Sequence, residues 1–308
     1  EADVMLHAGT MNWTYTLGVG ITDPWACGAT AVVYEGPRDP GVWPALIAAH
    51  GATVFAAVPS LYRRMLKYAD LAEHDLSRLR HGVTAGEALA PELLADWQAA
   101  TGKPLYEALG MSEISTYVSS GPTIPVRTGS PGKPQPGRRV AILSDDGAVL
   151  PPDETGLLAV HRSDPGLMLG YWNRPDEESA VLRGDWFVGG DRARLDADGY
   201  VWFEGRADDL MNAMGYRVSP NEIEGVLAAH PDVAEIGVSE IAVRPGVSVI
   251  AAFVVLTPHA VPNPEALTAW CAARLAAYKC PREIRFLEAL PRTANGKIQR
   301  KRLAEMRA

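Results

Sequence analysis

The stretch "GVTAGEALAPELLADWQAATGKPLYEALGMSE", residues 82–113, predicts a strand, a helix and a second strand in succession. The strands are expected at residues 82–85 and 104–109, which are short apolar runs. Between them, Pro91 suits the first turn of a helix that runs to Ala100 and buries one apolar face. Strands that alternate with helices at this spacing pair in parallel, so the stretch predicts a parallel sheet covered by helices.

The same alternation extends toward the beginning of the chain. We predict strands at residues 29–34 and 53–58, a helix at 43–50, and a second helix that Ser60 caps and that ends at Ala69. A further strand at residues 3–7 would end at His7. Four tryptophans lie in or beside apolar segments and are predicted to be core residues: Trp25, Trp43, Trp97 and Trp270. The predicted fold class is α/β, a parallel sheet with flanking helices.

The texture of the sequence changes at residue 121, where proline and glycine become dense. Short apolar runs between turn signals predict a small antiparallel β unit there. After Arg206 the chain starts again, and "SPNE" at residues 219–222 has the pattern of a capping box that opens a helix. We therefore predict a first domain at residues 1–207, with an α/β part at about 1–120 and a β-rich part at about 121–207, and a compact α+β domain at 208–308.

Composition excludes several classes of function. The formal net charge of −8 leaves no basic footprint for nucleic acid, and no run of eighteen apolar residues predicts a membrane span. Cys27, Cys271 and Cys280 lie far apart without a CxxC pair, which favours a reducing cytoplasm and speaks against structural zinc. The seven histidines show no HExxH spacing and no GxSxG elbow is present, so neither a zinc peptidase nor a triad hydrolase is predicted.

Two predicted parallel strands run directly into polar loops. Gly86 and Glu87 follow one strand, and Gly110, Ser112 and Glu113 follow the next. Ligands of open parallel sheets bind beyond the carboxyl ends of the strands, so this edge is a candidate nucleotide site.

Further along, Asp191 follows two glycines and Arg206 follows a hairpin folded at Asp198-Gly199. A carboxylate suits a ribose diol, and a guanidinium suits ribose or phosphate oxygens. Asp196 and Asp198 are assigned to the chemistry of the turn itself.

Four motifs occur in one order: "GEAL", "LGMSE", "GDRARLDADGYVWFEGRADDLMNAMGYRVSPNEIE" and "PRTANGKIQRKRL". Together they resemble the AMP-forming, adenylate-forming enzymes, and are most similar to acyl-CoA synthetases and benzoate-type aryl-CoA ligases. The resemblance implies ATP-dependent activation of a small aryl or short-chain carboxylic acid to an acyl-adenylate, followed by thioester formation with coenzyme A. It also implies bound Mg²⁺ and a mobile C-terminal domain after a large AMP-binding domain.

The resemblance implies a role for each matching residue. Gly86, Glu87, Ala88 and Glu107 would contact adenine, and Asp191 and Arg206 would contact ribose. The remaining assignments are Ser112 at the AMP phosphate, Glu113 at magnesium, Lys297 as the catalytic lysine of the first step, Asp208 as the hinge, Gly215 and Tyr216 in the coenzyme A tunnel, and His7 and Gly110 at the acyl group.

The chain departs from the family pattern in two ways. Leu109 stands where an aromatic ring often stacks on adenine, and the loop rich in serine, threonine and glycine that grips the ATP phosphates is not in this sequence. We expect that loop to lie upstream of residue 1. Two alternatives stay open: an adenylation domain that loads a carrier-protein phosphopantetheine, and an inactive nucleotide-binding fragment.

Overall fold

A computed structural model describes residues 2–87, 89–206, 211–213, 216–244, 247–293 and 298–306. The chain divides into two compact units, Glu1–Phe203 and Glu204–Ala308. No helix in these described ranges is long and apolar enough to cross a membrane.

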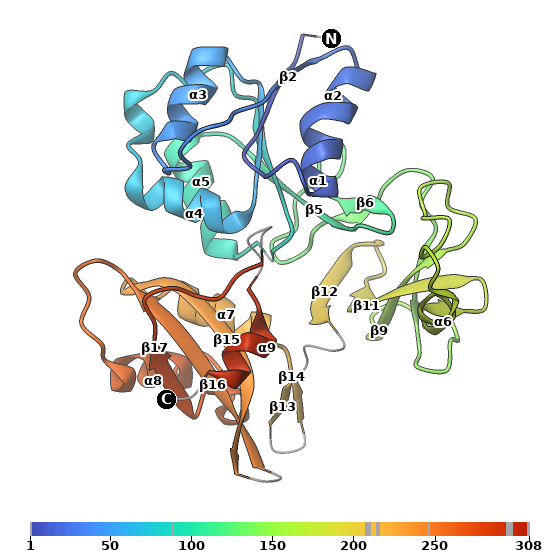
Figure 1. Cartoon of the computed structure of the whole chain (residues 1–308), viewed down its shortest axis with the longest axis vertical. Coiled ribbons are helices and arrows are strands. Elements are labelled where there is room, and N and C mark those ends of the chain that lie inside the picture. The colour runs from blue at the N-terminus through green and yellow to red at the C-terminus, as the bar shows by residue number, and fades with distance from the viewer. Residues whose placement is uncertain are drawn as a thin grey trace. The chain divides into compact units, whose positions relative to one another are not determined.

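The first unit is built on a seven-stranded sheet of order β2-β1-β3-β4-β5-β6-β7 (Figure 1). Strands β1 to β5 pair in parallel and β6 and β7 pair antiparallel, which confirms the predicted α/β fold. The strands are β1 (Val4–His7), β2 (Thr30–Val32), β3 (Val54–Ala57), β4 (His81–Ala85), β5 (Leu105–Met111), β6 (Ser115–Ser119) and β7 (Lys133–Pro134).

Helices cover both faces of this sheet. Figure 1 shows α3 (Val42–His50), α4 (Pro59–Tyr68) and α5 (Pro91–Thr101) on one side of the strands. Their apolar faces bury Trp43, Tyr62 and Trp97 against Phe55, and this cluster is the main core of the unit. The other side carries α1 (Thr14–Leu17), the π-helical turn η1 (Gly18–Thr22) and α2 (Asp23–Ala26).

Two local predictions for this unit were wrong. Helix α4 begins at Pro59 with Val58 at its N-cap, so Ser60 lies in the first turn and does not cap it. Proline at the first helical position fixes the start one residue earlier than the serine suggested. Trp25 is 65% exposed on α2 and is not a core residue.

The β-rich part of this unit is a second, antiparallel sheet of order β10-β11-β9-β8, with β12 paired to β11. Its core packs Ile142, Leu158 and Val160 against Tyr117 and Val118. The elements are β8 (Val140–Leu143), β9 (Gly156–His161), α6 (Pro175–Ala180), β10 (Leu182–Arg183), β11 (Trp186–Leu195) and β12 (Val201–Arg206), whose last residues belong to the second unit.

The second unit contains the sheet β15-β16-β17 and the ribbon β13-β14. Helices α7 and α8 pack on the sheet through Ile223, Leu227, Leu267 and Cys271. The elements are β13 (Met211–Ala213), β14 (Tyr216–Val218), α7 (Pro220–Ala228), β15 (Val233–Arg244), β16 (Val247–Leu256), α8 (Pro264–Ala272), the 3₁₀ turn η3 (Ala277–Lys279), β17 (Glu283–Phe286) and α9 (Arg300–Glu305).

The capping box predicted for α7 does not form. Ser219 occupies the N-cap, but its hydroxyl makes no capping hydrogen bond and is buried without a partner among the residues that the structure describes. Glu222, which would complete the box, instead accepts hydrogen bonds from Lys279 at 2.6 and 2.7 Å. A tertiary ion pair thus replaces the local cap.

Candidate active site

The loops singled out in the sequence leave neighbouring strands at one edge of the first sheet. Ala85, the last residue of β4, pairs in register with Ala108 of β5, and both strands run in the same direction. The turn at Gly86 and the turn at Ser112 therefore emerge side by side at the carboxyl ends of their strands, where open parallel sheets bind ligands.

The turn after β4 is held by contacts on both of its sides. Gly86 has φ of +89°, and a Cβ atom there would lie 2.7 Å from Cη2 of Trp13. Glu87 accepts hydrogen bonds from the backbone N–H of Ser60 at 3.0 Å and from its hydroxyl at 3.1 Å. The Glu87 carboxylate therefore satisfies the first turn of α4, where a negative charge is favoured.

The turn after β5 closes a hairpin with β6, in which Met111 pairs with Ser115. Gly110 is required by this geometry, because a Cβ atom there would lie 2.5 Å from the carbonyl oxygen of Ser115. Ser112 is exposed and Glu113 half-buried on the turn. In the described part of the chain, the Glu113 carboxylate accepts one hydrogen bond, from the hydroxyl of Tyr171 at 2.8 Å.

A third carboxyl group, that of Glu107, lies within β5. Its Oε1 accepts a hydrogen bond from the backbone N–H of Leu89 at 3.2 Å. Burial raises the pKa of Glu107 to about 7, because the charged form loses its hydration. The group can therefore exchange a proton near neutral pH at the same edge of the sheet.

His7 ends β1 at this edge, as the sequence predicts, and is 2% exposed. Its Nδ1 accepts a hydrogen bond from the backbone N–H of Gly9 at 2.8 Å, and its ring meets Tyr15 edge-on at 4.8 Å. Burial lowers the pKa of His7 to about 4, so the imidazole is neutral at physiological pH.

A cavity of about 350 Å³ lies along β4 and β5 and is bordered by β6, the second strand of the hairpin that carries Glu113. Cavities of this size hold small organic ligands. Its wall is formed on the sheet side by Val83, Tyr106 and Ala108, on the helical side by Tyr15 and Val19, and beyond the hairpin by Ser115, Ser119, Ser120 and Arg138. The cavity lies wholly within the first unit.

The positive charge in this wall is compensated. Arg138 forms an ion pair with Asp164, whose side chain is completely buried, and also donates to the carbonyl oxygen of Thr116 at 3.3 Å. The guanidinium therefore holds the backbone of β6 at Thr116, and its charge is balanced by Asp164.

Asp191 and Arg206 lie on consecutive strands. Asp191 is 6% exposed in β11. Burial raises the pKa of the nearby Tyr117 hydroxyl, and the negative charge of Asp191 raises it further. Arg206 is exposed at the end of β12 and belongs to the second unit.

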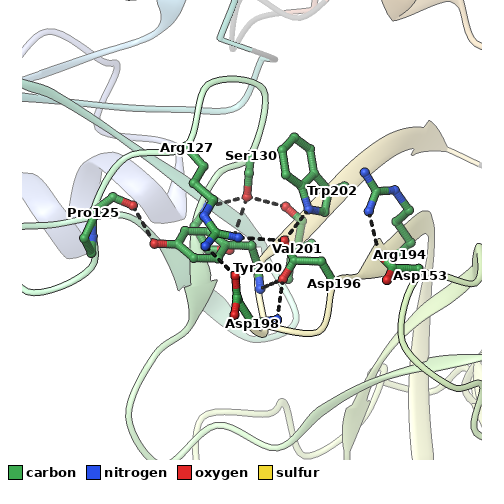
Figure 2. Close-up of polar contacts among 11 residues, drawn as sticks. Pro125, Arg127, Ser130, Asp153, Arg194, Asp196, Asp198, Tyr200, Val201 and Trp202 are labelled. Atoms are coloured by element: carbon green, nitrogen blue, oxygen red, sulfur yellow. Dashed lines mark hydrogen bonds and ion pairs between the residues drawn. The ribbon is translucent and has the colours of Figure 1, made fainter.

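The turn between β11 and β12 is a structural clamp (Figure 2). Oδ1 of Asp196 accepts hydrogen bonds from the backbone N–H groups of Asp198 and Tyr200 at 3.0 and 2.9 Å, which is the turn chemistry expected of it. Arg127 bridges both aspartates at 3.0 and 2.6 Å and stacks over the ring of Tyr200. Trp202 donates to Asp196 at 2.9 Å. These contacts fix the hairpin from which β12 departs.

Several predicted site residues lie outside the described residues: Ala88, Asp208, Gly215 and Lys297. Tyr216 begins β14, of which the backbone alone is described at that residue. Their roles stay predictions.

Sequence reasoning missed three aromatic residues that shape this edge. Trp13 covers Gly86, Tyr15 lines the cavity, and Tyr171 contacts Glu113 from 58 residues away. No local sequence pattern indicates these residues, because each contacts a residue that is distant in the sequence and becomes a neighbour only in the folded chain.

Comparison with known proteins follows the same division of the chain. Residues 1–172 match the model of the AMP-binding enzyme family, and residues 222–297 match that of the AMP-binding enzyme C-terminal domain. Human acyl-coenzyme A synthetase ACSM5, mitochondrial, is 37% identical over 98% of this chain and 54% of its own length. The 3-hydroxybenzoate–CoA ligase of Aromatoleum sp. (strain CIB) is 35% identical over 99% of this chain and 58% of its own length.

Among solved structures, the anthranilate CoA ligase AuaEII in complex with anthranoyl-AMP superposes with a TM-score of 0.92 at 34% identity. That comparison covers 99% of this chain and 60% of the ligase. The chain thus spans little more than half the length of the relatives it matches.

Proposed function

The chain belongs to the AMP-binding enzyme family, and on that premise we propose that its protein activates a small carboxylic acid with ATP and transfers the acyl group to coenzyme A. The observation that carries the proposal is that two polar turns leave the carboxyl ends of neighbouring strands at one sheet edge, while a ligand-sized cavity lies along the same two strands. The turns supply groups for a nucleotide, and the cavity along the strands supplies space for the body of an acid.

In the first half-reaction, the carboxylate of the acid attacks the α-phosphorus of ATP, a P–O bond forms and pyrophosphate leaves. We assign the adenine wall to the backbone of Gly86 and Ala88 together with Glu107. Support comes from the contacts of Glu87: its side chain is occupied by α4, so the contribution of that turn is its backbone. The exposed hydroxyl of Ser112 is assigned to the phosphate, and Asp191 and Arg206 to ribose.

Glu113 is the residue we assign to magnesium. Mg²⁺ is commonly bound through one or two carboxylates together with substrate phosphates and water, and it needs no cage of protein ligands. This requirement fits the described residues, which contain no cluster of three or more potential metal-binding side chains but do present Glu113 at the turn. Bound there, the ion would offset negative charge on the phosphate oxygens. Glu113 would hold the ion through one carboxylate oxygen, while the Tyr171 hydroxyl donates a hydrogen bond to the other.

In the second half-reaction, the thiol of coenzyme A attacks the acyl carbon and AMP leaves. Lys297 for the first step, Asp208 as hinge, and Gly215 and Tyr216 for the thiol tunnel stay proposals drawn from the motifs alone. His7 and Gly110 are proposed near the acyl group, and the contact between His7 and the cavity residue Tyr15 supports the first of these.

The test is an assay of both half-reactions with the full-length protein. Acid-dependent exchange of pyrophosphate into ATP, over a panel of short-chain and aromatic acids, reports the first step. Thioester formation with coenzyme A, compared with a phosphopantetheinylated carrier protein, reports the acceptor. Absence of acid-dependent exchange across the panel overturns the proposal.

We further propose a reducing compartment such as the cytoplasm, because Cys27, Cys271 and Cys280 are all unpaired thiols. The name of the human relative assigns that protein to mitochondria. Partners other than the acid, the nucleotide and the thiol acceptor are not part of the proposal.

A further inference from the structure

The segment at residues 120–134 leaves β6 and returns to pair with it as β7. Between these points it contacts the turn that joins β11 and β12 (Figure 2). The backbone N–H of Val201 donates to the carbonyl oxygen of Gly132 at 2.9 Å. The hydroxyl of Tyr200 donates to the carbonyl oxygen of Pro125, also at 2.9 Å. The segment therefore connects the β11–β12 turn to the hairpin of β5 and β6.

Arg127 lies at the centre of this connection. One of its terminal nitrogens binds Asp196 at 3.0 Å and the other binds Asp198 at 2.6 Å. The guanidinium carbon lies 3.9 Å from the centre of the Tyr200 ring. A planar guanidinium holds two carboxylates in a fixed relation, which the single ammonium of a lysine does not do. Arg127 therefore restrains the turn through charged groups and an aromatic ring at once.

Asp191 lies in the part of β11 where regular pairing with β9 is interrupted. The register of this pairing shifts between Val188 and Arg192, and Gly190 within the interval has φ of +86°. An irregularity of this kind changes the direction of the side chains it contains, and β-bulges are over-represented next to active sites. Pairing with β9 therefore does not by itself fix the direction of the Asp191 carboxylate.

The hairpin of β5 and β6 supplies further neighbours of this interval. A Cβ atom at Gly189 would lie 2.5 Å from the sulfur of Met111, so the missing side chain lets β11 approach β5 closely. Asp191 is near enough to the Tyr117 hydroxyl of β6 for its charge to act on that group. Asp191 is 6% exposed, and a carboxylate so nearly buried reaches a ligand only over a narrow range of positions. The position of β11 against this hairpin therefore decides whether Asp191 can bind a ribose.

We propose that Arg127 is a positioning residue for nucleotide binding: it holds the β11–β12 turn to the segment after β6 and thereby keeps Asp191 where its carboxylate binds a ribose hydroxyl. The inference rests on the proposed function through the assignment of Asp191 to ribose. Arg127 itself touches neither the nucleotide nor the acid. Because it acts through Asp191, its removal should weaken recognition of the ribose hydroxyl groups and leave binding of the rest of the nucleotide unchanged.

The test is nucleotide binding to the full-length protein, measured by calorimetry with AMP, 2′-deoxy-AMP and 3′-deoxy-AMP. These measurements need no turnover, so they are independent of the pyrophosphate-exchange assay. We expect AMP to bind at least about tenfold more tightly than one of the two deoxynucleotides, the scale of a hydrogen bond to a charged group. In Arg127→Met this preference should fall to within about twofold, because AMP loses affinity while that deoxynucleotide keeps its own.

Two further variants separate positioning from a merely structural role. Asp191→Ala should lose the same preference, and adding Arg127→Met to it should change the AMP affinity by less than about twofold, because both changes act through one contact. Arg194→Met is the matched control. Arg194 also lies on β11, pairs with Asp153 at 3.1 Å and stacks over Trp202, but these partners lie outside residues 120–134. The preference for AMP should therefore survive in the control.

Several outcomes would overturn the inference: a preference for AMP that Arg127→Met leaves unchanged, equal weakening of all three nucleotides in that variant, or loss of the preference in Arg194→Met. Failure of the wild-type protein to bind AMP, or equal binding of all three nucleotides, removes the ribose assignment and the inference with it. Acid-dependent pyrophosphate exchange then still decides the proposed function. If the preference behaves as expected but no acid supports exchange, the inference stands and the proposed acid activation is wrong.

Discussion

The turns that follow β4 and β5 each contain a glycine and, one to three residues later, a glutamate: Gly86 with Glu87, and Gly110 with Glu113. In the first turn the glutamate is held by two hydrogen bonds from Ser60, at the start of α4. In the second it accepts one hydrogen bond, from Tyr171. The two glycines differ as well, since Gly86 is covered by an indole side chain and Gly110 by the backbone of the facing strand.

The two carboxylates therefore differ in role: that of Glu87 supports a helix, whereas that of Glu113 can contact a ligand. Glu87 offsets the unpaired N–H groups at the start of a helix, which is a structural task. Glu113 is half-buried on the hairpin turn between β5 and β6, and one of its oxygens accepts a hydrogen bond from the Tyr171 hydroxyl. Similar sequence patterns on neighbouring strands thus support different roles, and substitutions can test the division.

The largest effect is expected from Glu113→Gln. The amide retains an oxygen for the Tyr171 hydroxyl but is a far poorer magnesium ligand, so acid-dependent pyrophosphate exchange should fall between about a hundredfold and a thousandfold. The melting temperature should change little, because the hydrogen bond survives. Wild-type exchange rates with an unaltered magnesium dependence would show that Glu113 has no such role.

The second prediction concerns Glu107 and the pH dependence of the free energy of unfolding. Its folded pKa of about 7 lies above the unfolded value, so between about pH 4 and pH 7 the native state binds more protons than the unfolded state. Stability contributed by the protonated group is therefore present in acid and is lost as pH rises through 7, by up to about 3 kcal/mol.

Glu107→Gln should remove this dependence, because the amide does not titrate and keeps an acceptor for the Leu89 N–H. Denaturant unfolding of both proteins at about pH 5 and about pH 8 provides the measurement, and the variant should gain stability relative to wild type at the higher pH. A constant difference between the two proteins across this range would contradict the assignment.

The general architecture of this edge was predictable from the sequence, because strand–helix alternation has a local signature. The elements around Pro91 and the turns at Gly86 and Ser112 follow from apolar periodicity and from glycine and proline positions. The strand β15, by contrast, has no counterpart among the predicted elements. Its sequence "VAEIGVSEIAVR" mixes charged and apolar residues, and its pairing with β16 depends on a partner strand later in the chain.

Contacts between distant residues account for what the sequence could not supply. Ser60 was expected to cap its own helix, whereas Glu87, 27 residues away, binds its N–H and hydroxyl. Tyr171 meets Glu113 across 58 residues. Such pairs leave no periodicity in the sequence, so the sequence did not show that the start of a helix binds the Glu87 side chain or that a tyrosine binds that of Glu113.

A smaller effect, on stability alone, is expected from Glu87→Ala. The change removes both hydrogen bonds to Ser60 and should lower the free energy of unfolding by about 1–2 kcal/mol. Ser60→Ala, which loses the hydroxyl and keeps the backbone N–H, should cost about half as much. Adenylation at saturating substrate should stay within about threefold of wild type, since the backbone wall of the turn remains. A loss of adenylation as deep as that of Glu113→Gln, with normal stability, would erase the distinction between the two turns.

The smallest effect is expected from Tyr171→Phe, which removes the hydrogen bond that the Glu113 carboxylate accepts from Tyr171 and leaves the rest of the ring. A ligand held less firmly should bind its metal more weakly, so the magnesium concentration for half-maximal pyrophosphate exchange should rise about fivefold to tenfold. The rate at saturating magnesium should stay within about twofold, because the carboxylate itself is intact. Tyr34→Phe, which loses a hydroxyl remote from the turn, controls for the substitution. A merely structural tyrosine would lower the melting temperature without moving the magnesium curve, and that result would make Tyr171 a packing residue and leave Glu113 to act without it.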